Sequence, residues 1–322
     1  MVRPIVLLTG AAGFIGSNVL DQLQSRDFDV IAVDALIESN YGREQKLINW
    51  EEAISKFPET NFIVGDLRDP FFTRSLPSAD YVIHEAAVPG LNLSWENFPL
   101  YESCNVIATQ NLIEYAISRN VKRFVLASTS SVYGKEAIGG EDSLLQPVSP
   151  YGVTKLAAEK LVLAYAANFS LPYSILRYFS VYGDRQRPDM AYSIFCENLV
   201  SGKTINIYGD GNQSRTNTHV RDVARVTIES MLSKGMENQI VNIAGETELS
   251  VNAAIDILEA ALNLHCSRNF MDPRKGDQTR TVGNINKAKS LGLHINSIGV
   301  KEGLTAQALQ FKEDFEKHGL RI

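Results

Sequence analysis

The stretch TGAAGFIG, residues 9–16, begins where the apolar run IVLL of residues 5–8 ends, and it has glycines at positions 10, 13 and 16. Between a first strand and a first helix, Gly10, Gly13 and Gly16 would permit a tight turn, close approach of the backbone to a pyrophosphate, and close helix packing. The spacing is G-x-x-G-x-x-G, one residue longer in its first interval than the usual dinucleotide fingerprint. A purely structural glycine turn is the alternative, so the loop must be weighed with its context.

The first half of the chain alternates short apolar runs with helical patterns. After the first run come DVIAVD (29–34), NFIVGD (61–66), DYVIHEAA (80–87), KRFVLAS (122–128) and PYSILRY (172–178). Strands that alternate with helices form βαβ units and parallel sheets. The sequence therefore predicts an α/β fold, a Rossmann doubly wound parallel sheet covered by helices, with its first helix starting at about Ser17.

Two longer helices are also expected. One starts near Asn105, and the other follows Ser149-Pro150, an N-cap residue with proline at the first helical position. Helical spacing of apolar residues favours core packing against the sheet, and a dimer-forming helix pair is the alternative. The apolar positions are Ile107, Leu112, Ile113 and Ala116 in the first helix, and Val153, Leu156, Ala157, Leu161, Ala164 and Tyr165 in the second. We expect a homodimer formed through the helices that start near Asn105 and Tyr151.

The sequence pattern changes after Tyr178: segments typical of turns, such as YGDRQRPD and YGDGNQ, become more frequent, and the apolar runs become shorter. HVRDVARVTIESML and QIVNIAG look like a return to the first layer. We expect a main domain over residues 1–178 with a return segment at about 219–244, and a smaller, interleaved C-terminal lobe over 179–322.

Composition limits the classes of partner. The 322 residues are 44% hydrophobic and 21% charged with a formal charge of -6, and they contain no basic run of the kind that nucleic-acid binders need. No segment approaches the roughly 20 apolar residues of a membrane span. Cys104, Cys196 and Cys266 are odd in number and lack metal-ligand spacing, which favours a reduced compartment. We expect a cytoplasmic protein with no metal site, no nucleic-acid partner and no membrane contact.

Acidic and small residues at later strand ends indicate which dinucleotide would bind. Asp34 ends the second run about twenty residues after the glycine loop, where a carboxylate accepts from both ribose hydroxyls and repels a 2′-phosphate. No Lys or Arg directly follows it, so NAD is favoured over NADP. Asp66 has the position to bind the adenine amine or, alternatively, to cap a helix. Ala86 and Ala87 are small enough for a cofactor to lie flat against them.

The segment YGVTK places Tyr151 and Lys155 four residues apart, on one face of a helix. A nearby ammonium and a positive nicotinamide ring both favour phenolate, and lowering the tyrosine pKa from about 10 to about 7 requires roughly 4 kcal/mol. Thr129, at the preceding strand end, would share the substrate's hydroxyl proton with Tyr151 in general base catalysis. An ordinary surface Y-x-x-x-K is the alternative, which the glycine loop and the hydroxyl-rich strand end disfavour.

Taken together, TGAAGFIG, Asp34, GDL, HEAA, STSSVYG, SPYGVTK and RYFSVYG resemble the extended short-chain dehydrogenase/reductases of the nucleotide-sugar epimerase/dehydratase group, over nearly the whole chain. The resemblance implies an NAD-binding Rossmann domain and a C-terminal lobe that binds a UDP-, GDP-, CDP- or dTDP-sugar. In that family's cycle the tyrosine takes the C4 hydroxyl proton and the C4 hydride passes to NAD, leaving a 4-keto sugar. The cofactor-binding residues it implies are Gly10, Gly13, Phe14, Ile15, Gly16, Asp34, Asp66, Leu67, Ala86, Ala87, Asn105, Ser128, Tyr151, Lys155 and Tyr178.

The residues after Thr129 favour one branch of this family. Dehydratases of the group have Asp-Glu there and related decarboxylases have a glutamate at the second place, whereas this chain has Ser130 and Ser131. An unactivated hydroxyl is a far weaker acid or base than a carboxyl group. Rotation of the keto sugar and return of the hydride to its opposite face, which is C4 epimerisation, is the expected fate.

The segment GDRQRPDMA, residues 183–191, resembles one found in UDP-glucuronate 4-epimerases, in which the arginine at the position of Arg187 faces the uronate carboxylate. An arginine fork suits a carboxylate, and the small hydroxyl of Ser180 leaves room beside C6. The resemblance also implies that Arg215 and Arg280 bind the diphosphate. The substrate-binding set is thus Thr129, Ser130, Ser131, Ser180, Arg187, Arg215 and Arg280.

Four positions depart from the family pattern, and they bear on the sugar more than on the reaction. They are Glu85, Asn92, Asp184 and Asn217. We expect a UDP-hexuronate 4-epimerase that interconverts UDP-glucuronate and UDP-galacturonate. The alternatives are a UDP-glucose or UDP-N-acetylglucosamine 4-epimerase, a dehydratase or decarboxylase, and a non-catalytic NAD-binding protein.

Overall fold

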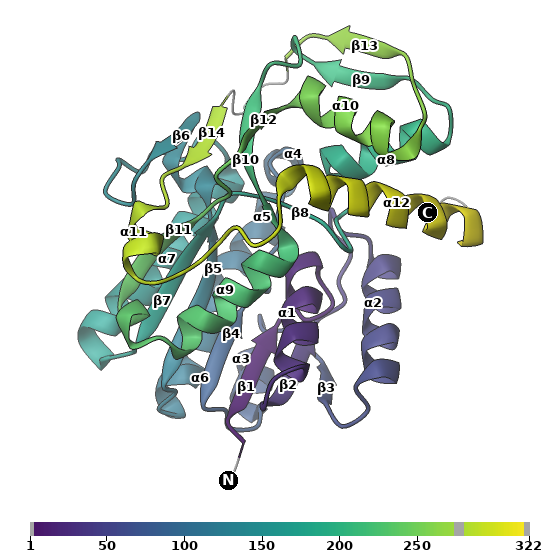
Figure 1. Ribbon diagram of the computed structural model, residues 1–322. Helices are drawn as coiled ribbons and strands as arrows, with labels where there is room; N and C mark the ends of the chain where they lie inside the picture. Colours follow the sequence, from purple (N-terminus) through teal and green to yellow (C-terminus); the bar gives the residue numbers. More distant parts are fainter. Residues whose placement is uncertain (1–2, 274–279, 319–322) are drawn as a thin grey trace.

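The structure, a computed structural model, describes residues 3–273 and 280–318. Figure 1 shows a sheet with helices on both faces and a smaller lobe above one end of it. The sheet has seven strands in the order β11-β7-β5-β4-β1-β2-β3, and every neighbouring pair is parallel. The predicted Rossmann fold is confirmed. The bounds of these strands are β1 Ile5–Thr9, β2 Asp29–Asp34, β3 Asn61–Val64, β4 Tyr81–His84, β5 Arg123–Thr129, β7 Tyr173–Tyr178 and β11 Gln239–Ile243.

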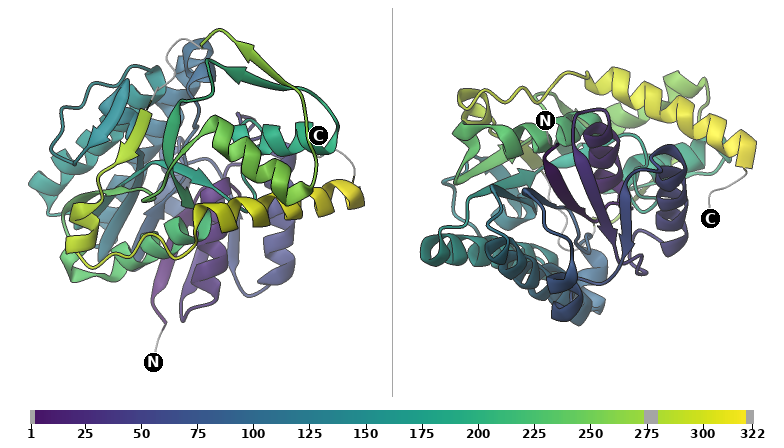
Figure 2. Two further views of the ribbon diagram at one scale, coloured as in Figure 1. Left: turned by 45° about the horizontal axis from the view of Figure 1, so that its top comes forward. Right: turned by 90° about the horizontal axis from the view of Figure 1, so that it is seen from below.

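Helices cover the two faces of this sheet, as the view from below in Figure 2 makes plain. Side chains of successive strand residues point to opposite faces, so Val6 and Leu8 join one core and Leu7 joins the other. The first face carries α1 Phe14–Gln24, α2 Arg43–Lys56, α9 Val220–Leu232 and α11 Asn286–Ser290; the second carries α3 Pro70–Ser75, α6 Ala108–Ser118 and α7 Pro150–Phe169.

The lobe has its own apolar core beneath a two-stranded sheet. It contains β9 Ile205–Tyr208, β13 Arg268–Met271, α8 Ala191–Val200, α10 Val251–Leu262 and α12 Val300–His318. A further sheet joins it to the main body through β6 Glu136–Gly139, β8 Ser180–Tyr182, β10 Ser214–His219, β12 Glu248–Ser250 and β14 Arg280–Gly283. Shorter helical segments are α4 Asn92–Glu96, α5 Phe98–Glu102, a π turn at Ser103–Ile107, and 3₁₀ turns at Ser130–Tyr133 and Lys234–Met236.

The two parts of the chain exchange strands. β11 comes from the C-terminal half and pairs with β7 in the main sheet, while β6 comes from the first half and pairs with β14 beside the lobe. The division at residue 178 remains a proposal, and its C-terminal range includes residues 274–279 and 319–322, which lie outside the described residues. Within the described parts, the structure contains no helix both long and apolar enough to cross a membrane.

Two helix starts differ from the sequence-based expectation. α1 begins at Phe14, earlier than Ser17, because extended Gly13 is its N-cap and accepts a hydrogen bond from the Ser17 N–H. The helix expected near Asn105 continues a helical path that begins at Phe98. Ile107, in the π turn, is 40% exposed and does not belong to the core.

The apolar residues predicted to pack α7 against the sheet are not the most buried residues of this helix. The buried residues of this helix are Gly152, Thr154, Lys155, Ala158, Glu159 and Val162. Val153 is 48% exposed and Ala164 is also exposed. The side of α7 that faces the sheet combines apolar Ala158 and Val162 with functional and ion-paired groups, so apolar periodicity pointed to a different side.

One of these groups, Glu159, forms a buried ion pair with Arg177 of β7. The guanidinium donates to both carboxylate oxygens, at 3.0 and 2.8 Å, and the two side chains are 2% and 1% exposed. Ser128 of β5 donates to the same carboxylate at 2.5 Å, and the guanidinium also donates to the Tyr133 hydroxyl at 2.9 Å. The pair therefore holds α7 against the ends of β5 and β7.

Replacing one partner should be costly, because the other becomes an uncompensated buried charge. We expect Arg177→Met to lower the free energy of unfolding by about 3–5 kcal/mol, measured by denaturant unfolding followed by circular dichroism. Arg3→Met is the matched control, since Arg3 pairs with Asp27 where the two side chains are 58% and 85% exposed, and it should change stability by less than about 1 kcal/mol. Equal losses for the two variants would contradict this assignment.

Candidate active site

The glycine loop is packed tightly between β1, α1 and the end of β4. Gly10 has φ +71, and a Cβ there would lie 2.6 Å from the backbone N of Ala86. A Cβ on Gly16 would lie 2.0 Å from the carbonyl oxygen of Gly10. Side chains at these positions would push the loop away from α1 and β4. The N–H groups of the first turn, at Phe14 and Ile15, have no carbonyl partner within a helix and suit an anion.

A cleft of about 640 Å³ opens at this edge of the sheet, where the carboxyl ends of β1, β2, β3 and β4 meet. The structure thus brings together residues that are far apart in sequence, and a narrow glycine-floored cleft fits a dinucleotide. The cleft is lined by Gly10, Gly13, Asp34, Asp66, Leu67, Ala86 and Ala87 from the predicted set, and also by Lys46, Arg68, Glu85 and Cys104.

Asp34 is only 8% exposed and is fixed by the backbone. It accepts hydrogen bonds from the N–H groups of Ala12 at 3.0 Å and Leu36 at 2.9 Å. Burial raises the pKa of its carboxyl group, and the two N–H groups and the Lys46 ammonium oppose that rise. Lys46 was missed by the sequence reasoning because it reaches Asp34 from α2, and its ammonium donates to the Ile37 carbonyl at 2.8 Å.

Asp66 is bound bidentately by Arg68, with nitrogen–oxygen distances of 2.9 and 2.5 Å to one oxygen. Burial raises the pKa of the Asp66 carboxyl group, but the bonds from Arg68 outweigh burial and lower it. The residue that caps α3 is Asp69, which accepts from the Phe71 N–H. Asp66 therefore lies in the cleft as a charged acceptor.

Three residues of the predicted cofactor set are held by other parts of the protein. Asn105 bonds to both backbone groups of Val88 and donates to the Thr154 hydroxyl, so it ties the loop after β4 to α7. Ser128 donates to Glu159. The hydroxyl of Tyr178 lies 2.7 Å from a Glu85 carboxylate oxygen. These contacts indicate a positioning function for the three side chains.

Thr129, Tyr151 and Lys155 come from the end of β5 and the first turns of α7. Burial raises the pKa of the Tyr151 hydroxyl, whereas the Thr129 hydroxyl and the Arg187 charge lower it. The expected value near 7 is therefore not reached by the protein's own groups, because desolvation of the phenol dominates. The positive nicotinamide ring is the remaining stabilising charge. Lys155 is 3% exposed, and burial lowers its pKa to about 8 against the pull of the Glu85 and Glu159 carboxylates.

Glu85 is the family departure with the clearest surroundings. Burial raises the pKa of this carboxyl group to about 7, while the Tyr178 hydroxyl and the Lys155 ammonium lower it. Neighbouring His84 bonds to the Thr9 hydroxyl at 2.7 Å, and burial lowers the pKa of its ring to about 3. Glu85 thus places a titrating group beside Lys155, whereas His84 is a neutral structural residue.

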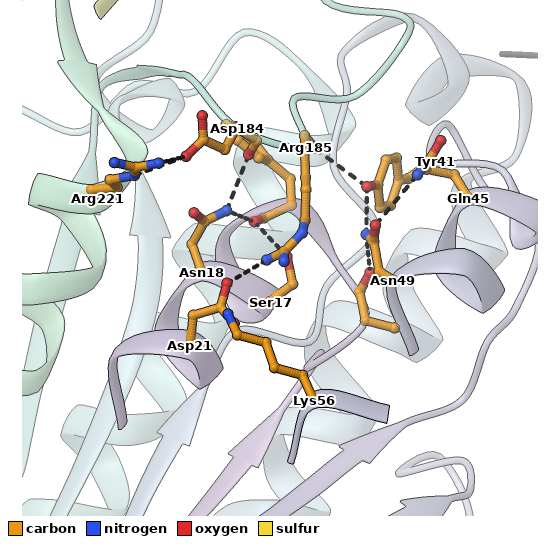
Figure 3. Close-up of polar contacts among 12 residues, drawn as sticks. Ser17, Asn18, Asp21, Tyr41, Gln45, Asn49, Lys56, Asp184, Arg185 and Arg221 are labelled. Carbon is orange, nitrogen blue, oxygen red and sulfur yellow. Dashed lines mark hydrogen bonds and ion pairs between the residues drawn. The ribbon is translucent and has the colours of Figure 1, made fainter. Parts of the chain in front are cut away.

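The loop that carries Arg187 is anchored to α1 and to the segment just before α2, at residues shown in Figure 3. Asn18 donates to the Asp184 carbonyl at 3.1 Å, and the Tyr41 hydroxyl donates to the Arg185 carbonyl at 3.2 Å. The Asp184 carboxylate also pairs with Arg221, which gives this departure from the family pattern a physical reason. Arg187 projects from this anchored loop, close enough to Tyr151 for its charge to act on the phenol.

The remaining substrate residues approach from the strands between the two parts of the chain. Ser180 of β8 is the register partner of Asn217 on β10, and the Tyr192 hydroxyl donates to Asn217 at 2.9 Å. Asn217, one of the departures from the family pattern, is thus held by Tyr192 of α8.

The two predicted diphosphate arginines lie on neighbouring strands. The strand pairing places Ser214 opposite Arg280, next to Arg215. Arg280 is exposed and binds Glu248 at 2.7 and 2.8 Å, which lowers the pKa of that carboxyl group to about 2. Asn92, at the start of α4, is exposed, and nothing in the structure explains its departure from the pattern.

A second cleft, of about 760 Å³, lies between α2, α8, α12 and the loop at residues 183–188. Gln45, Arg185 and Gln307 line it, and Thr129, Tyr151, Lys155 and Arg187 do not. These last four residues do not line the cleft at the sheet edge either, but Glu85, which does, acts on the charges of Tyr151 and Lys155 and so connects that cleft to the proposed chemistry.

Comparisons with known proteins agree with this geometry. A family model described as the NAD dependent epimerase/dehydratase family matches residues 6–244. The chain is 36% identical to an uncharacterized UDP-glucose epimerase of Bacillus subtilis, over 93% of this chain and 95% of the relative. It is also 36% identical to a UDP-glucuronate 4-epimerase of Thermodesulfobacterium geofontis, over 96% of this chain and 97% of the relative.

A solved structure gives the same result. The UDP-glucuronic acid 4-epimerase from Bacillus cereus, in complex with UDP-glucuronic acid and NAD, matches with a TM-score of 0.90 and 35% identity, over 96% of this chain and 99% of that chain. The resemblance to extended short-chain dehydrogenase/reductases is therefore confirmed, and this chain belongs to the NAD dependent epimerase/dehydratase family.

Proposed function

We propose that this protein interconverts UDP-glucuronate and UDP-galacturonate by epimerisation at C4. The observation that carries the proposal is the Arg187 guanidinium, held by an anchored loop near the Tyr151 phenol. A cation beside the reacting carbon suits a sugar with a carboxylate at C6. Relatives and solved structures that act on UDP-glucuronate support this choice.

The chain's own residues supply the proton transfers. Tyr151 accepts the proton of the C4 hydroxyl, Thr129 shares that proton by hydrogen bonding, and the Lys155 ammonium stabilises the phenolate. Gly10, Gly13, Asp34 and neighbouring residues of the cleft would hold NAD, which when bound would supply reversible hydride transfer at C4.

Ser130 and Ser131 lie directly after Thr129, in a 3₁₀ turn in which the Ser131 N–H donates to Thr129. Both residues offer hydroxyls where elimination requires carboxyl groups. The 4-keto sugar therefore keeps its carboxylate and all its oxygen atoms until it is reduced again.

A neutral UDP-sugar is the second candidate substrate, and a specific contact favours it. Asp189 occupies the Nε and Nη2 edge of the Arg187 guanidinium, so this arginine already has a counter-ion without a carboxylate from the substrate. The similarity to a UDP-glucose epimerase supports the same candidate.

We also infer that the protein forms a homodimer through α6 and α7. The two helices pack side by side. Ile107, in the π turn that precedes α6, is 40% exposed, and Val153 of α7 is 48% exposed. A second copy would cover these side chains from water.

The first prediction tests the chemistry. Tyr151→Phe should lower kcat about 10²- to 10⁴-fold for whichever UDP-sugar turns over, because the variant cannot accept the C4 proton. Tyr165→Phe, on the same helix, is the matched control and should keep its activity. NMR of the product sugar measures the rate, and undiminished activity of Tyr151→Phe would assign the base to another residue.

The second prediction tests the substrate. With UDP-glucuronate and NAD, chromatography with mass detection should show a new product of unchanged mass. Arg187→Ala should lower kcat/KM for the uronate about 10- to 100-fold because a charge-assisted bond is lost, with little effect on UDP-glucose. The kcat/KM of Arg187→Lys for the uronate should lie between those of the wild type and Arg187→Ala, because lysine keeps the positive charge but lacks the guanidinium fork. A product that has lost carbon dioxide or water would overturn the epimerase assignment.

The third prediction tests the assembly. The double change Ile107→Glu with Val153→Glu should shift the protein from dimer to monomer in sedimentation velocity, because it places charges in the interface. Phe71→Glu, at a residue of α3 that is 78% exposed, should leave the dimer intact. A wild-type protein that sediments as a monomer would exclude this interface.

A further inference from the structure

We propose that Asp189 is an internal counter-ion that competes with the substrate's carboxylate for Arg187 and so sets the preference between charged and neutral UDP-sugars. This inference rests on the proposed function, because it concerns the same arginine. It adds a residue that determines specificity without touching the reacting carbon.

The Arg187 and Asp189 side chains form a bidentate ion pair. The Arg187 Nε donates to one Asp189 oxygen at 2.8 Å, and the Nη2 donates to the other at 3.1 Å. This is the bidentate geometry that a guanidinium would offer to a uronate. The Arg187 side chain is only 16% exposed, so it lies largely out of water beside its counter-ion, which is 35% exposed.

Asp189 has a second partner that can retain it when Arg187 is released. The Asn40 amide donates to Asp189 at 3.3 Å, and the Asn40 carbonyl oxygen accepts from the Tyr101 hydroxyl at 3.2 Å. The Tyr101 ring lies 6.2 Å from the Tyr151 ring, centroid to centroid. The counter-ion is thus part of a polar chain that ends beside the catalytic helix.

The loop backbone is fixed ahead of Arg187, so the exchange requires only side-chain movement. Figure 3 shows Asn18 and Tyr41 holding the carbonyls of Asp184 and Arg185, and the Arg185 guanidinium paired with Asp21 at 2.8 Å. Beyond Asp189, α8 begins at Ala191. Asp189 can therefore turn from Arg187 toward Asn40 while the loop remains in place.

The consequences differ for the two kinds of sugar. A neutral sugar leaves the Arg187–Asp189 pair intact and meets no unpaired cation. A uronate must either displace Asp189 from the Nε and Nη2 groups or bind on the Nη1 side, and in both cases it lies near the negative charge of Asp189. Asp189 therefore weakens the preference for uronates that Arg187 alone would impose, and it makes the site tolerant of neutral UDP-sugars.

The test compares UDP-glucuronate with UDP-glucose in the NAD-loaded enzyme. Asp189→Asn should raise the ratio of kcat/KM values, uronate over glucose, by about 5- to 30-fold, the effect of removing one negative charge a few ångströms away. Asp184→Asn is the matched control because Asp184 lies on the same loop and pairs with Arg221, and its ratio should equal that of the wild type. In an Arg187→Ala background no guanidinium remains to compete for, so Asp189→Asn should change the ratio by a clearly different factor than it does in the wild type.

Two results would overturn the inference. One is an unchanged ratio in a folded Asp189→Asn variant, including the case in which both sugars lose activity equally. The other is the same rise in the Arg187→Ala background.

If the wild type does not turn over UDP-glucuronate at all, the proposed substrate is wrong, but the inference is still tested. UDP-glucuronate should then inhibit UDP-glucose turnover 5- to 30-fold more tightly in Asp189→Asn, by the same loss of repulsion, and an unchanged inhibition constant would reject it.

Discussion

The buried pair of Arg177 and Glu159 is the interaction on which the active-site geometry depends. It joins the C-terminal end of β7 to the middle of α7, and Ser128 brings the end of β5 into the same cluster. Thr129 follows Ser128 directly, and Lys155 lies one helical turn before Glu159. A charge pair shielded from water has strict geometric demands, so it fixes the distance between the strand end and the helix that share the chemistry.

Above this pair, the site combines several ionisable groups in a small, poorly solvated space. Burial alone would raise the pKa of Tyr151 and Glu85 and lower that of Lys155. The ammonium of Lys155 and the carboxyl group of Glu85 partly offset each other. The positive nicotinamide ring of NAD would favour the phenolate in turn. Proton uptake by the tyrosine is therefore linked to a bound cofactor, which fits a family whose reaction begins with loss of a proton from the C4 hydroxyl group and of a hydride from C4.

Substrate selection is organised differently from the chemistry. The proposed catalytic groups come from a strand end of the main sheet and a helix packed on it, whereas Arg187 comes from a loop whose carbonyl groups are held by Asn18 of α1 and by Tyr41, just before α2. Exchange of the partner of one arginine can then alter the preferred sugar without disturbing the proton relay. Such a separation is consistent with a family whose members share a fold and a cofactor but act on different UDP-sugars.

Much of the fold was predictable because its signals are local. Glycine spacing at residues 10, 13 and 16, apolar runs of strand length, and Ser149-Pro150 before α7 each act within a few residues of chain. The order of the glycine loop, Asp34, Thr129 and the Tyr151–Lys155 pair similarly indicated the cleft, because the carboxyl ends of parallel strands meet at one edge of a sheet.

Other features depend on contacts between distant segments, and only the tertiary structure decided them. The buried side of α7 mixes apolar residues with Lys155 and with Glu159, which pairs with Arg177, and sequence periodicity does not reveal this mixture. Lys46 reaches Asp34 from the next helix, Glu85 meets Tyr178 across the sheet, and the Arg187 fork is filled by Asp189. Sequence by itself determined the fold and the types of residue available for catalysis. The pairing of buried charges, which sets their pKa values and their freedom to bind substrate, was determined by the packing of segments far apart in the chain.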